Sequence, residues 1–252
     1  MRYGFIGAGE ITAAIVTGLS DGVAEPPEVF LSPRGRTVGR ELAQRFPNVR
    51  VCAGNQDVLG NATAIVLAVR PAVAREVVGE LRFRPGHTVL SALAGIPLAA
   101  LREWTAPART VVRTIPLPQA ERRQSLTALY PDDPVARELY EQVGGVVVPG
   151  DEAMLDAFSA ATATFAAHLD YLATIAGWLA EHGVAPEQAD GFVTHVFAQL
   201  GQSLGTDSLA ALTGKHTTPG GINEQLKTDL REAGVPGAVR HALDGVLARL
   251  RG

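Results

Sequence analysis

In the first twenty residues, a short apolar run, a glycine turn and a helical pattern follow one another directly. The apolar run at residues 3–6 ends at the sequence GAGEIT of residues 7–12, and apolar positions then recur at helical spacing as far as Leu19. This order is the context that a dinucleotide-binding fingerprint requires. Gly7 suits a tight turn, and Gly9 has no Cβ to keep a pyrophosphate from the helix N-terminus. The alternative is an ordinary strand-to-helix turn, but its place at the start of an alternating pattern favours a nucleotide site.

Residues 1–150 continue this alternation of short apolar runs and helical patterns. The run at residues 64–69 is continuously apolar, which is typical of a parallel strand buried on both faces. Further strands are expected at residues 29–31, 49–51, 88–91, 111–116, 126–130 and 146–148, and helices at 37–46, 72–81 and 135–143. The pattern predicts a Rossmann-type α/β domain over residues 1–150, whose parallel strands would collect ligands at their carboxyl ends.

The end of the second predicted strand indicates which nicotinamide cofactor binds. A carboxylate at this place would bind the ribose 2′-hydroxyl of NAD, whereas residues 32–36 offer a hydroxyl and two guanidinium groups. Such groups suit a 2′-phosphate. We therefore predict NADPH rather than NADH as the cofactor, with Ser32 and Arg34 as ligands and Arg36 as a candidate third. The alternative is that these arginines form only a solvated turn.

Two further strand ends are expected beside the dinucleotide. One is residues 68–71, and the other is residues 92–97, whose small side chains would let a flat ring approach the backbone. Glu10 is unusual within the glycine turn, because a pyrophosphate would repel its carboxylate unless the side chain faced solvent or the nicotinamide side. The predicted cofactor-binding residues are Gly7, Gly9, Glu10, Ile11, Ser32, Arg34, Ala68, Val69, Arg70, Pro71, Ala94 and Gly95.

From residue 151 the strand pattern disappears and helical spacing takes over. Apolar side chains recur along residues 155–179, 192–204 and 226–250, so residues 151–252 are predicted to form an all-α domain. About a hundred residues of such helix offer more apolar surface than a domain of that size buries. A homodimer through these helices would cover it, and a self-contained bundle is the alternative.

The charge and the cysteine content narrow the class of protein. A net charge of −4 over 252 residues, without a basic tract, argues against nucleic acid and anionic membranes as partners. Cys52 is the only cysteine, which excludes an intrachain disulfide framework and a multi-cysteine metal site. No histidine and carboxylate pair has metal-ligand spacing, so no metal is expected. The first residues lack the pattern of a signal peptide, and with the single cysteine this favours a cytoplasmic protein.

A polar, glycine-rich turn at residues 215–221 precedes one of the C-terminal helices. Its backbone N–H groups and threonine hydroxyls can cradle a substrate carboxylate at the helix N-terminus, with an asparagine as a further donor. Lys215 and His216 would add charge complementarity or a proton donor, or form only an exposed polar turn. His168 lies among apolar positions and is interpreted as an interior or interface group. The predicted catalytic and substrate-binding residues are Thr217, Thr218, Gly220, Gly221 and Asn223.

Four short motifs follow the order and spacing of one known family. They are GFIGAG at residues 4–9, AVRP at 68–71, SALAGI at 91–96 and TPGG at 218–221. Over nearly its whole length the chain resembles the pyrroline-5-carboxylate reductases, which make proline by hydride transfer to a cyclic imine. The resemblance implies a Rossmann domain, an all-helical C-terminal domain that dimerises by interleaving, and an active site made from both.

Three segments of the chain depart from the family's pattern. Leu117 replaces an asparagine, Ile222 and Asn223 replace two threonines, and residues 160–166 lack the family's serine- and glycine-rich sequence. The expected function is NADPH-dependent reduction of a cyclic imine, with pyrroline-5-carboxylate as the leading substrate. The departures keep two alternatives open: a reductase of another imine or imino acid, and a catalytically weak dinucleotide-binding protein. Reduction of an α-keto acid is disfavoured because no placed proton donor accompanies the nicotinamide site.

Overall fold

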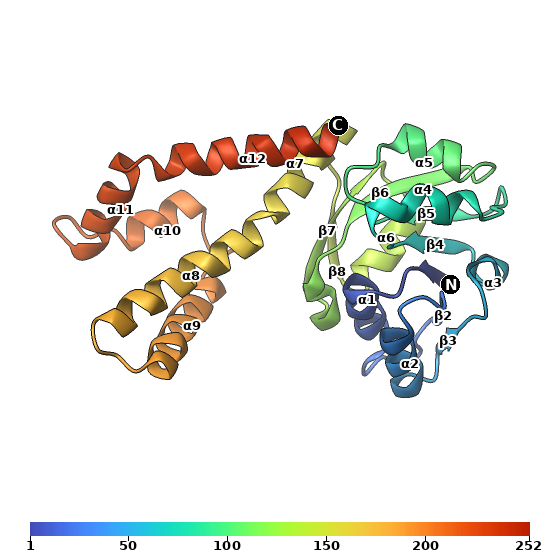
Figure 1. Cartoon of the computed structure of the whole chain (residues 1–252), viewed down its shortest axis with the longest axis horizontal. Coiled ribbons are helices and arrows are strands. Elements are labelled where there is room, and N and C mark those ends of the chain that lie inside the picture. The colour runs from blue at the N-terminus through green and yellow to red at the C-terminus, as the bar shows by residue number, and fades with distance from the viewer. The chain divides into compact units, whose positions relative to one another are not determined.

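The computed structural model describes residues 1–252, with the exception of the side chain of Arg36. The chain forms two compact units (Figure 1). Unit 1 comprises Met1–Ser159 together with Arg249–Gly252, and unit 2 comprises Ala160–Ala248. Unit 1 is therefore discontinuous in sequence, because residues from both ends of the chain belong to it.

Unit 1 is built on one eight-stranded sheet with the order β3-β2-β1-β4-β5-β6-β7-β8. The strands are β1 (Arg2–Ile6), β2 (Glu28–Leu31), β3 (Val49–Val51), β4 (Ala64–Leu67), β5 (Thr88–Ser91), β6 (Thr110–Ile115), β7 (Ser125–Tyr130) and β8 (Gly144–Val147). Strands β1 to β6 pair in parallel, β7 is antiparallel to β6, and β8 is parallel to β7. The strand order reverses between β1 and β4, which is the position at which open α/β sheets bind ligands.

The central strands of the sheet are buried on both faces. Tyr3 and Phe5 of β1 belong to one hydrophobic core and Ile6 to another, because successive side chains of a strand leave opposite faces. The same alternation separates Val66 from Leu67 on β4. A continuously apolar strand such as β4 therefore contributes to two cores at once, as expected for a parallel sheet that is covered by helices on both faces.

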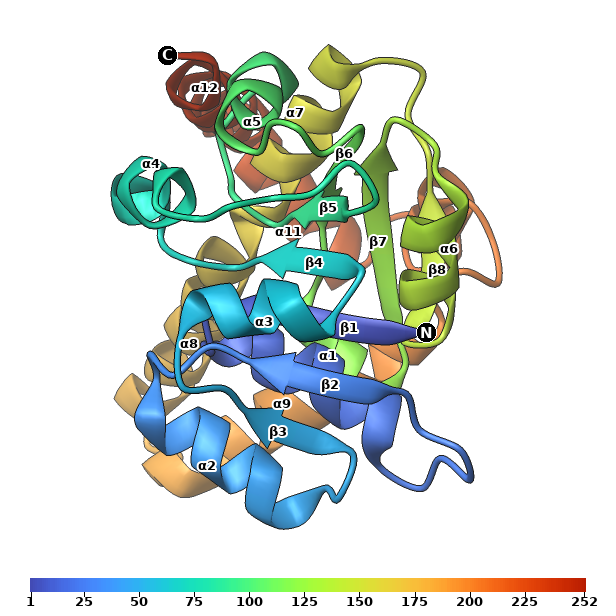
Figure 2. The same ribbon diagram turned by 90° about the vertical axis from the view of Figure 1, so that its right-hand side faces the viewer.

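Helices cover both faces of this sheet. The helices of unit 1 are α1 (Glu10–Ser20), α2 (Arg36–Arg45), α3 (Asn55–Asn61), α4 (Pro71–Gly79), α5 (Leu98–Trp104), the 3-10 helix η1 (Pro118–Arg122), α6 (Pro134–Glu141) and most of α7 (Glu152–Thr162). Residues of α1, α2 and α6 pack in one core, and residues of α3, α4 and α5 pack in the other. Accordingly, α1 and α3 lie on opposite sides of the sheet (Figure 2). The predicted Rossmann-type α/β fold is confirmed.

The sequence periodicity does not indicate α3, α5 or η1. Each spans seven residues or fewer, so it completes at most about two turns and buries few apolar positions. In α3 these are Val58 and Leu59, and in α5 they are Leu98 and Leu101. Elements of this length leave too weak a pattern to be told from the connections around them.

Unit 2 is helical, as predicted. It contains α8 (Thr164–Glu181), α9 (Pro186–Gln202), α10 (Leu209–Lys215), α11 (Ile222–Glu232) and α12 (Val235–Arg251) as far as Ala248. Its core is small, with Ala176, Ala189 and Val193 buried between α8 and α9. Large apolar side chains elsewhere on these helices are exposed, and Leu169 and Phe192 are 65% and 63% exposed. No helix among the described residues is both long enough and apolar enough to cross a membrane.

Candidate functional site

The turn between β1 and α1 is held by close backbone packing. Gly7 has a φ of +105°, and a Cβ there would lie 2.4 Å from the carbonyl oxygen of Ala68. Gly35, which precedes α2, has a φ of +85°, and a Cβ there would lie 2.3 Å from the carbonyl oxygen of Ala8. Both positions need glycine, because a side chain would be strained at this φ and would collide with backbone. The turn therefore packs closely against Ala68 after β4 on one side and against Gly35 after β2 on the other.

Two hydroxyl groups brace the same turn. Thr12 occupies the third position of the glycine fingerprint, is fully buried, and donates from Oγ1 to the Gly7 carbonyl oxygen at 2.6 Å. Ser32, directly after β2, accepts a hydrogen bond from the Gly7 N–H at 2.9 Å through its Oγ. Gly7 uses only the acceptor side of this hydroxyl, and Ser32 is 2% exposed. The structure thus gives Ser32, a predicted 2′-phosphate ligand, an additional role in fixing the turn.

The N-terminus of α1 fits a phosphate group. Gly9 is the N-cap residue, and no described side chain caps this end of the helix. A Cβ built on Gly9 would meet no described atom within 4 Å, so the space at this residue is open. Uncapped N–H groups at the positive end of a helix dipole are the donor set that suits a pyrophosphate. A dinucleotide cofactor therefore fits the residues present at this turn.

The carboxyl end of β4 lies directly beside the turn. The Ala68 N–H donates to the Ile6 carbonyl oxygen at 2.8 Å and so extends the pairing of β1 with β4. Arg70 is the exposed N-cap residue of α4, and Pro71 begins that helix, where its missing N–H would have no helical partner. Val69 packs against the core formed with α3, α4 and α5. The structure therefore brings the predicted residues 68–71 next to the glycine turn.

The loop at residues 92–97 is tied down at both ends. The Ala92 N–H donates to the Leu67 carbonyl oxygen at 2.9 Å, and the N–H of Leu98, just after the loop, donates to Oε1 of Glu152 at 2.7 Å. Between these bonds, Ala94 is exposed and Gly95 is half-buried with a φ of +73°. A fixed loop with small side chains at its centre suits the close approach of a flat ring.

Four charged side chains, hereafter the Arg113 cluster, adjoin this loop. Arg113 on β6 is 5% exposed and forms ion pairs of 2.8 Å with Glu152 and with Asp156, both on α7. Arg251, the last residue of α12, lies 3.7 Å from Asp156. The sequence prediction missed this cluster, although a lone charged residue in a buried strand is a signal for buried partner charges.

The other predicted cofactor ligands lie on α1 and in the loop after β2. Arg34 is exposed one residue before Gly35. Arg36 is the predicted third 2′-phosphate ligand, and its side chain lies outside the described residues. In the first turn of α1, Ile11 packs against the core and Glu10 is exposed, in agreement with the expected solvent-facing carboxylate.

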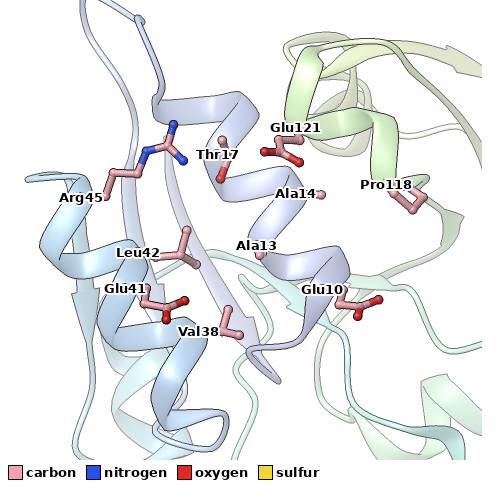
Figure 3. A pocket seen from close by; sticks show the side chains of 10 residues that line it. All are labelled: Glu10, Ala13, Ala14, Thr17, Val38, Glu41, Leu42, Arg45, Pro118 and Glu121. Atoms are coloured by element: carbon pink, nitrogen blue, oxygen red, sulfur yellow. The ribbon is translucent and has the colours of Figure 1, made fainter. Parts of the chain in front are cut away.

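Glu10 lines a groove of about 450 Å³ between α1, α2 and η1 (Figure 3). The groove is lined by Glu10, Ala13, Ala14, Thr17, Val38, Glu41, Leu42, Arg45, Pro118 and Glu121. Its carboxylates outnumber its single arginine, and Arg45 already pairs with Asp21 at 2.7 Å. Three carboxylates would repel a negatively charged dinucleotide, so this groove is not assigned to the cofactor.

The glycine-rich loop of unit 2 uses its own donors internally. The Gly220 N–H donates to Oε2 of Glu224 at 2.7 Å, and the Gly221 N–H donates to the Thr218 carbonyl oxygen at 2.9 Å. The hydroxyl of Thr217 donates to a backbone carbonyl of α10. One of the N–H groups predicted to bind a substrate carboxylate thus already holds a carboxylate. The sequence prediction missed Glu224. Its position, three residues after the paired glycines, is the pattern that could have indicated this contact.

The polar residues around this loop are exposed. Lys215 forms an exposed ion pair, His216 is the C-cap residue of α10, and Asn223 lies exposed in the first turn of α11. His168 is exposed on α8, where its ring stacks on that of Tyr171 with 6.5 Å between centroids. His168 is therefore not an interior group of unit 2, and the interpretation as an interface group remains.

A Rossmann-type sheet with a phosphate-compatible glycine turn at its strand-order reversal is typical of dinucleotide-dependent oxidoreductases. In agreement, a family described as NADP oxidoreductase coenzyme F420-dependent matches residues 2–95. The pyrroline-5-carboxylate reductase of Pseudomonas aeruginosa is 27% identical over 98% of this chain and 95% of its own length. The pyrroline-5-carboxylate reductases of Pisum sativum and Bacillus subtilis are likewise similar to this chain over 98% of its length, at 28% and 23% identity.

Solved structures of that family share the fold over the full chain. The pyrroline-5-carboxylate reductase of Streptococcus pyogenes superposes with a TM-score of 0.83 at 23% identity, covering 100% of this chain and 98% of its own. The pyrroline carboxylate reductase of Plasmodium falciparum, solved with NADP bound, has a TM-score of 0.80 at 15% identity and covers 100% and 97% of the two chains.

Proposed function

We propose that this protein reduces 1-pyrroline-5-carboxylate to proline with NADPH. The observation that carries the proposal is the braced glycine turn at the strand-order reversal, in a chain whose relatives of that name match almost its full length. An iminium is already an electrophile, so its reduction requires orientation and charge complementarity more than an acid–base triad. The site assembled around the turn supplies such orienting groups.

The cofactor half of the site is formed by strand ends of unit 1. When bound, the nicotinamide supplies the hydride for the reduction. Gly7 and Gly9 admit the pyrophosphate, and the first-turn N–H groups of α1 neutralise part of its charge. Residues 68–71 line the same edge of the sheet, and Ala94 and Gly95 offer a surface of small groups to the ring.

A preference for NADPH over NADH rests on the residues that follow β2. Ser32 and Arg34 provide a hydroxyl and a guanidinium there, and a carboxylate for a free ribose hydroxyl is missing from residues 32–36. The Arg34→Asp variant should bind NADPH at least about tenfold more weakly and NADH about as well as the wild type, because only NADPH loses a charge-assisted contact. Calorimetric titration with both cofactors measures this. Equal losses for the two cofactors would contradict the assignment.

The substrate half of the site is assigned to the glycine-rich loop of unit 2. Its donors are Thr217, Thr218, Gly220, Gly221 and Asn223. Glu224 now occupies the Gly220 N–H, so a substrate carboxylate that binds there has to displace the Glu224 side chain. The carboxylate of Glu224 supports the view that this loop accepts an anionic group, since the N–H already binds one.

We assign residues 151–252 to a helical dimerisation and substrate domain, and the cytoplasm as the location. The exposed apolar side chains of unit 2 support a homodimer, because a second copy would remove them from water. The single cysteine, Cys52, supports a reducing compartment. Sedimentation analysis of the purified protein tests the dimer, and a monomer at micromolar concentration would contradict it.

The decisive experiment follows NADPH consumption by purified protein with pyrroline-5-carboxylate, with NADH in parallel. Rapid NADPH-linked turnover with proline as the product supports the proposal. Measurable NADPH binding without turnover would overturn the substrate assignment and leave the cofactor assignment standing.

A second candidate is the reduction of a different imine that lacks a carboxylate. The observation that favours it is Glu224, which occupies the anion-binding N–H of Gly220, together with Leu117 and Ile222 in place of polar family residues. Turnover of 1-pyrroline or 2-methyl-1-pyrroline at a higher kcat/KM than pyrroline-5-carboxylate would decide in favour of this candidate.

A further inference from the structure

The last residues of the chain contact the loop that follows β5. A Cβ built on Gly95 would lie 3.4 Å from the backbone carbonyl oxygen of Leu250 and 3.6 Å from Cδ2 of the same residue. Gly95 has a positive φ, so the loop bends at the residue that faces Leu250. The end of α12 thus packs on the residue that, under the proposed function, faces the nicotinamide ring.

Arg251 anchors this end of α12 on α7. Its guanidinium donates to the Ala153 carbonyl oxygen at 3.0 Å and lies 3.7 Å from Oδ2 of Asp156. The other carboxylate oxygen of Asp156 pairs with the buried Arg113 at 2.8 Å. The last residue of the helix is therefore part of the Arg113 cluster, and Leu250 is held beside Gly95 by the contacts of its neighbour.

The same cluster also holds the far end of the loop. Oε1 of Glu152 accepts hydrogen bonds from the Leu98 N–H at 2.7 Å and from Arg113 at 2.8 Å. Arg113 thus connects the carboxylate that fixes Leu98 to the carboxylate that fixes Arg251. Two arginines and two carboxylates balance in charge, which allows Arg113 to be buried without a net charge in the interior.

We propose that Leu250 and Arg251 are positioning residues of the oxidoreductase site: they fix the loop at residues 92–97 so that Ala94 and Gly95 receive the nicotinamide ring. This inference rests on the proposed function for the identity of the ring. Under the proposed function, the glycine turn and the loop after β2 hold the adenosine and pyrophosphate ends of the cofactor, so the last turn of α12 acts on the nicotinamide end alone.

The test compares two ligands that differ only at the nicotinamide. Dissociation constants are measured by calorimetry for NADPH and for 2′-phospho-ADP-ribose, which lacks the ring. Leu250→Ala and Arg251→Gln should weaken NADPH binding about three- to tenfold and change binding of 2′-phospho-ADP-ribose less than twofold. Arg251→Lys should restore most of the loss, because a lysine keeps the charge beside Asp156. The matched control is Arg249→Gln, an exposed arginine two residues away, which should change neither constant.

Three outcomes overturn the inference. Unchanged NADPH binding in both variants would show that the loop needs no support from α12. Equal weakening of both ligands would show a general loss of structure, which thermal melting of the same samples detects. Failure of Arg251→Lys to recover binding would show that the ion pair with Asp156 is not what positions the loop. Should Leu250→Ala fail to fold, Arg251→Gln tests the same contact from the exposed side of the helix.

The binding ratio also keeps this inference separate from the proposed function. A wild-type protein that binds NADPH but reduces no pyrroline-5-carboxylate would contradict the proposed substrate, and the ligand pair would still test Leu250 and Arg251. An active reductase whose variants retain the wild-type ratio would contradict the role of α12 and leave the proposed function intact.

Discussion

The glycine turn at residues 7–12 and the glycine loop at residues 215–221 both lead into a helix N-terminus, yet their surroundings differ. A Cβ on Gly7 would meet backbone at 2.4 Å, whereas a Cβ on Gly220 would meet no described atom within 4 Å. Buried hydroxyls brace the first turn, and the second forms hydrogen bonds with its own residues and its own helix. The turn assigned to the cofactor is therefore held in place without a ligand, whereas the loop assigned to the substrate would have to exchange hydrogen bonds when one binds.

The two units also differ in how completely they bury their apolar side chains. Unit 1 buries large side chains completely, such as Tyr3 and Tyr140. Unit 2 buries mainly alanine and valine and leaves Leu209 and Ile222 73% and 85% exposed. One unit completes its core within a single chain, and the other carries apolar surface that a partner would cover. The unit with the complete core is thus the one that is assigned to the cofactor.

The largest effect is expected when the fixed turn itself is broken. Gly7→Val should lower the free energy of unfolding of unit 1 by roughly 3 to 5 kcal/mol, because the side chain combines a positive φ with a backbone collision. Urea unfolding measures the loss. Gly220→Ala is the matched control in the unbraced loop and should cost only about 1 kcal/mol. Similar losses at both positions would abolish the contrast between the two glycine segments.

A substitution two residues later should separate binding from folding. Gly9→Val should weaken NADPH binding roughly 30-fold, about 2 kcal/mol, because its side chain would project into the open space that is assigned to the pyrophosphate. Its free energy of unfolding should stay within about 0.5 kcal/mol of the wild type, since no described atom lies near the new side chain. Titration of NADPH fluorescence gives the affinity, and an unchanged affinity would contradict the fingerprint.

In the loop assigned to the substrate, by contrast, a substitution is expected to strengthen ligand binding. Glu224→Ala frees the Gly220 N–H and should lower KM for pyrroline-5-carboxylate about fivefold, close to 1 kcal/mol, because the substrate no longer competes with an internal carboxylate. Steady-state kinetics at saturating NADPH measures this. Glu232→Ala, at the other end of α11, is the control and should leave KM unchanged. A raised KM in Glu224→Ala would show that Glu224 assists the substrate.

The smallest expected effect is a pH dependence of the unfolding free energy. It arises at the turn of unit 1 that contains Arg84 and His87. His87 is 3% exposed, its Nδ1 accepts the Arg84 N–H at 3.1 Å, and its Nε2 lies 3.1 Å from the Leu59 carbonyl oxygen. Burial and the neighbouring Arg84 charge lower the pKa of His87 below 6.5. The unfolded chain therefore binds a proton more readily, so the stabilising contribution of neutral His87 is present above pH 6.5 and is lost as pH falls through the lowered pKa.

The corresponding variant is His87→Gln, which cannot titrate. The wild type should lose more unfolding free energy than His87→Gln between pH 7.5 and pH 5, as measured by urea unfolding at several pH values. His241→Gln, an exposed histidine of unit 2, should follow the wild-type curve. Parallel curves for all three proteins would show that protonation of His87 is not coupled to folding.

The sequence predicts the framework of unit 1 because its patterns are local. The run at residues 64–69 indicates a buried parallel strand, and the fingerprint at residues 7–12 predicts a phosphate site at the start of the first helix. Thr12 is visible in the sequence only as a departure from glycine. Its hydrogen bond to the Gly7 carbonyl oxygen depends on the folded turn, so its bracing role requires the structure.

The candidate site is less predictable because its supporting contacts join distant residues. Arg113 and Glu152 lie 39 positions apart, and no sequence motif around either residue indicates that the two are in contact. The Glu224 bond to Gly220 is local, but an acidic residue in a first helical turn is common and indicates only a favourable helix start. Residue types along the chain therefore point to the ligand, whereas the groups that hold those residues emerge only from the folded contacts.

The discontinuity of unit 1 bears on how the protein is made. A ribosome that has completed residue 159 must still add roughly 90 residues to reach Arg249, which takes on the order of 5 to 20 s. During that interval the eight strands are available to pair, while the loop at residues 92–97 and Asp156 lack their contacts from Leu250 and Arg251. The nascent chain therefore has all eight strands before it has Leu250 and Arg251, and the loop at residues 92–97 gains its contacts with α12 later.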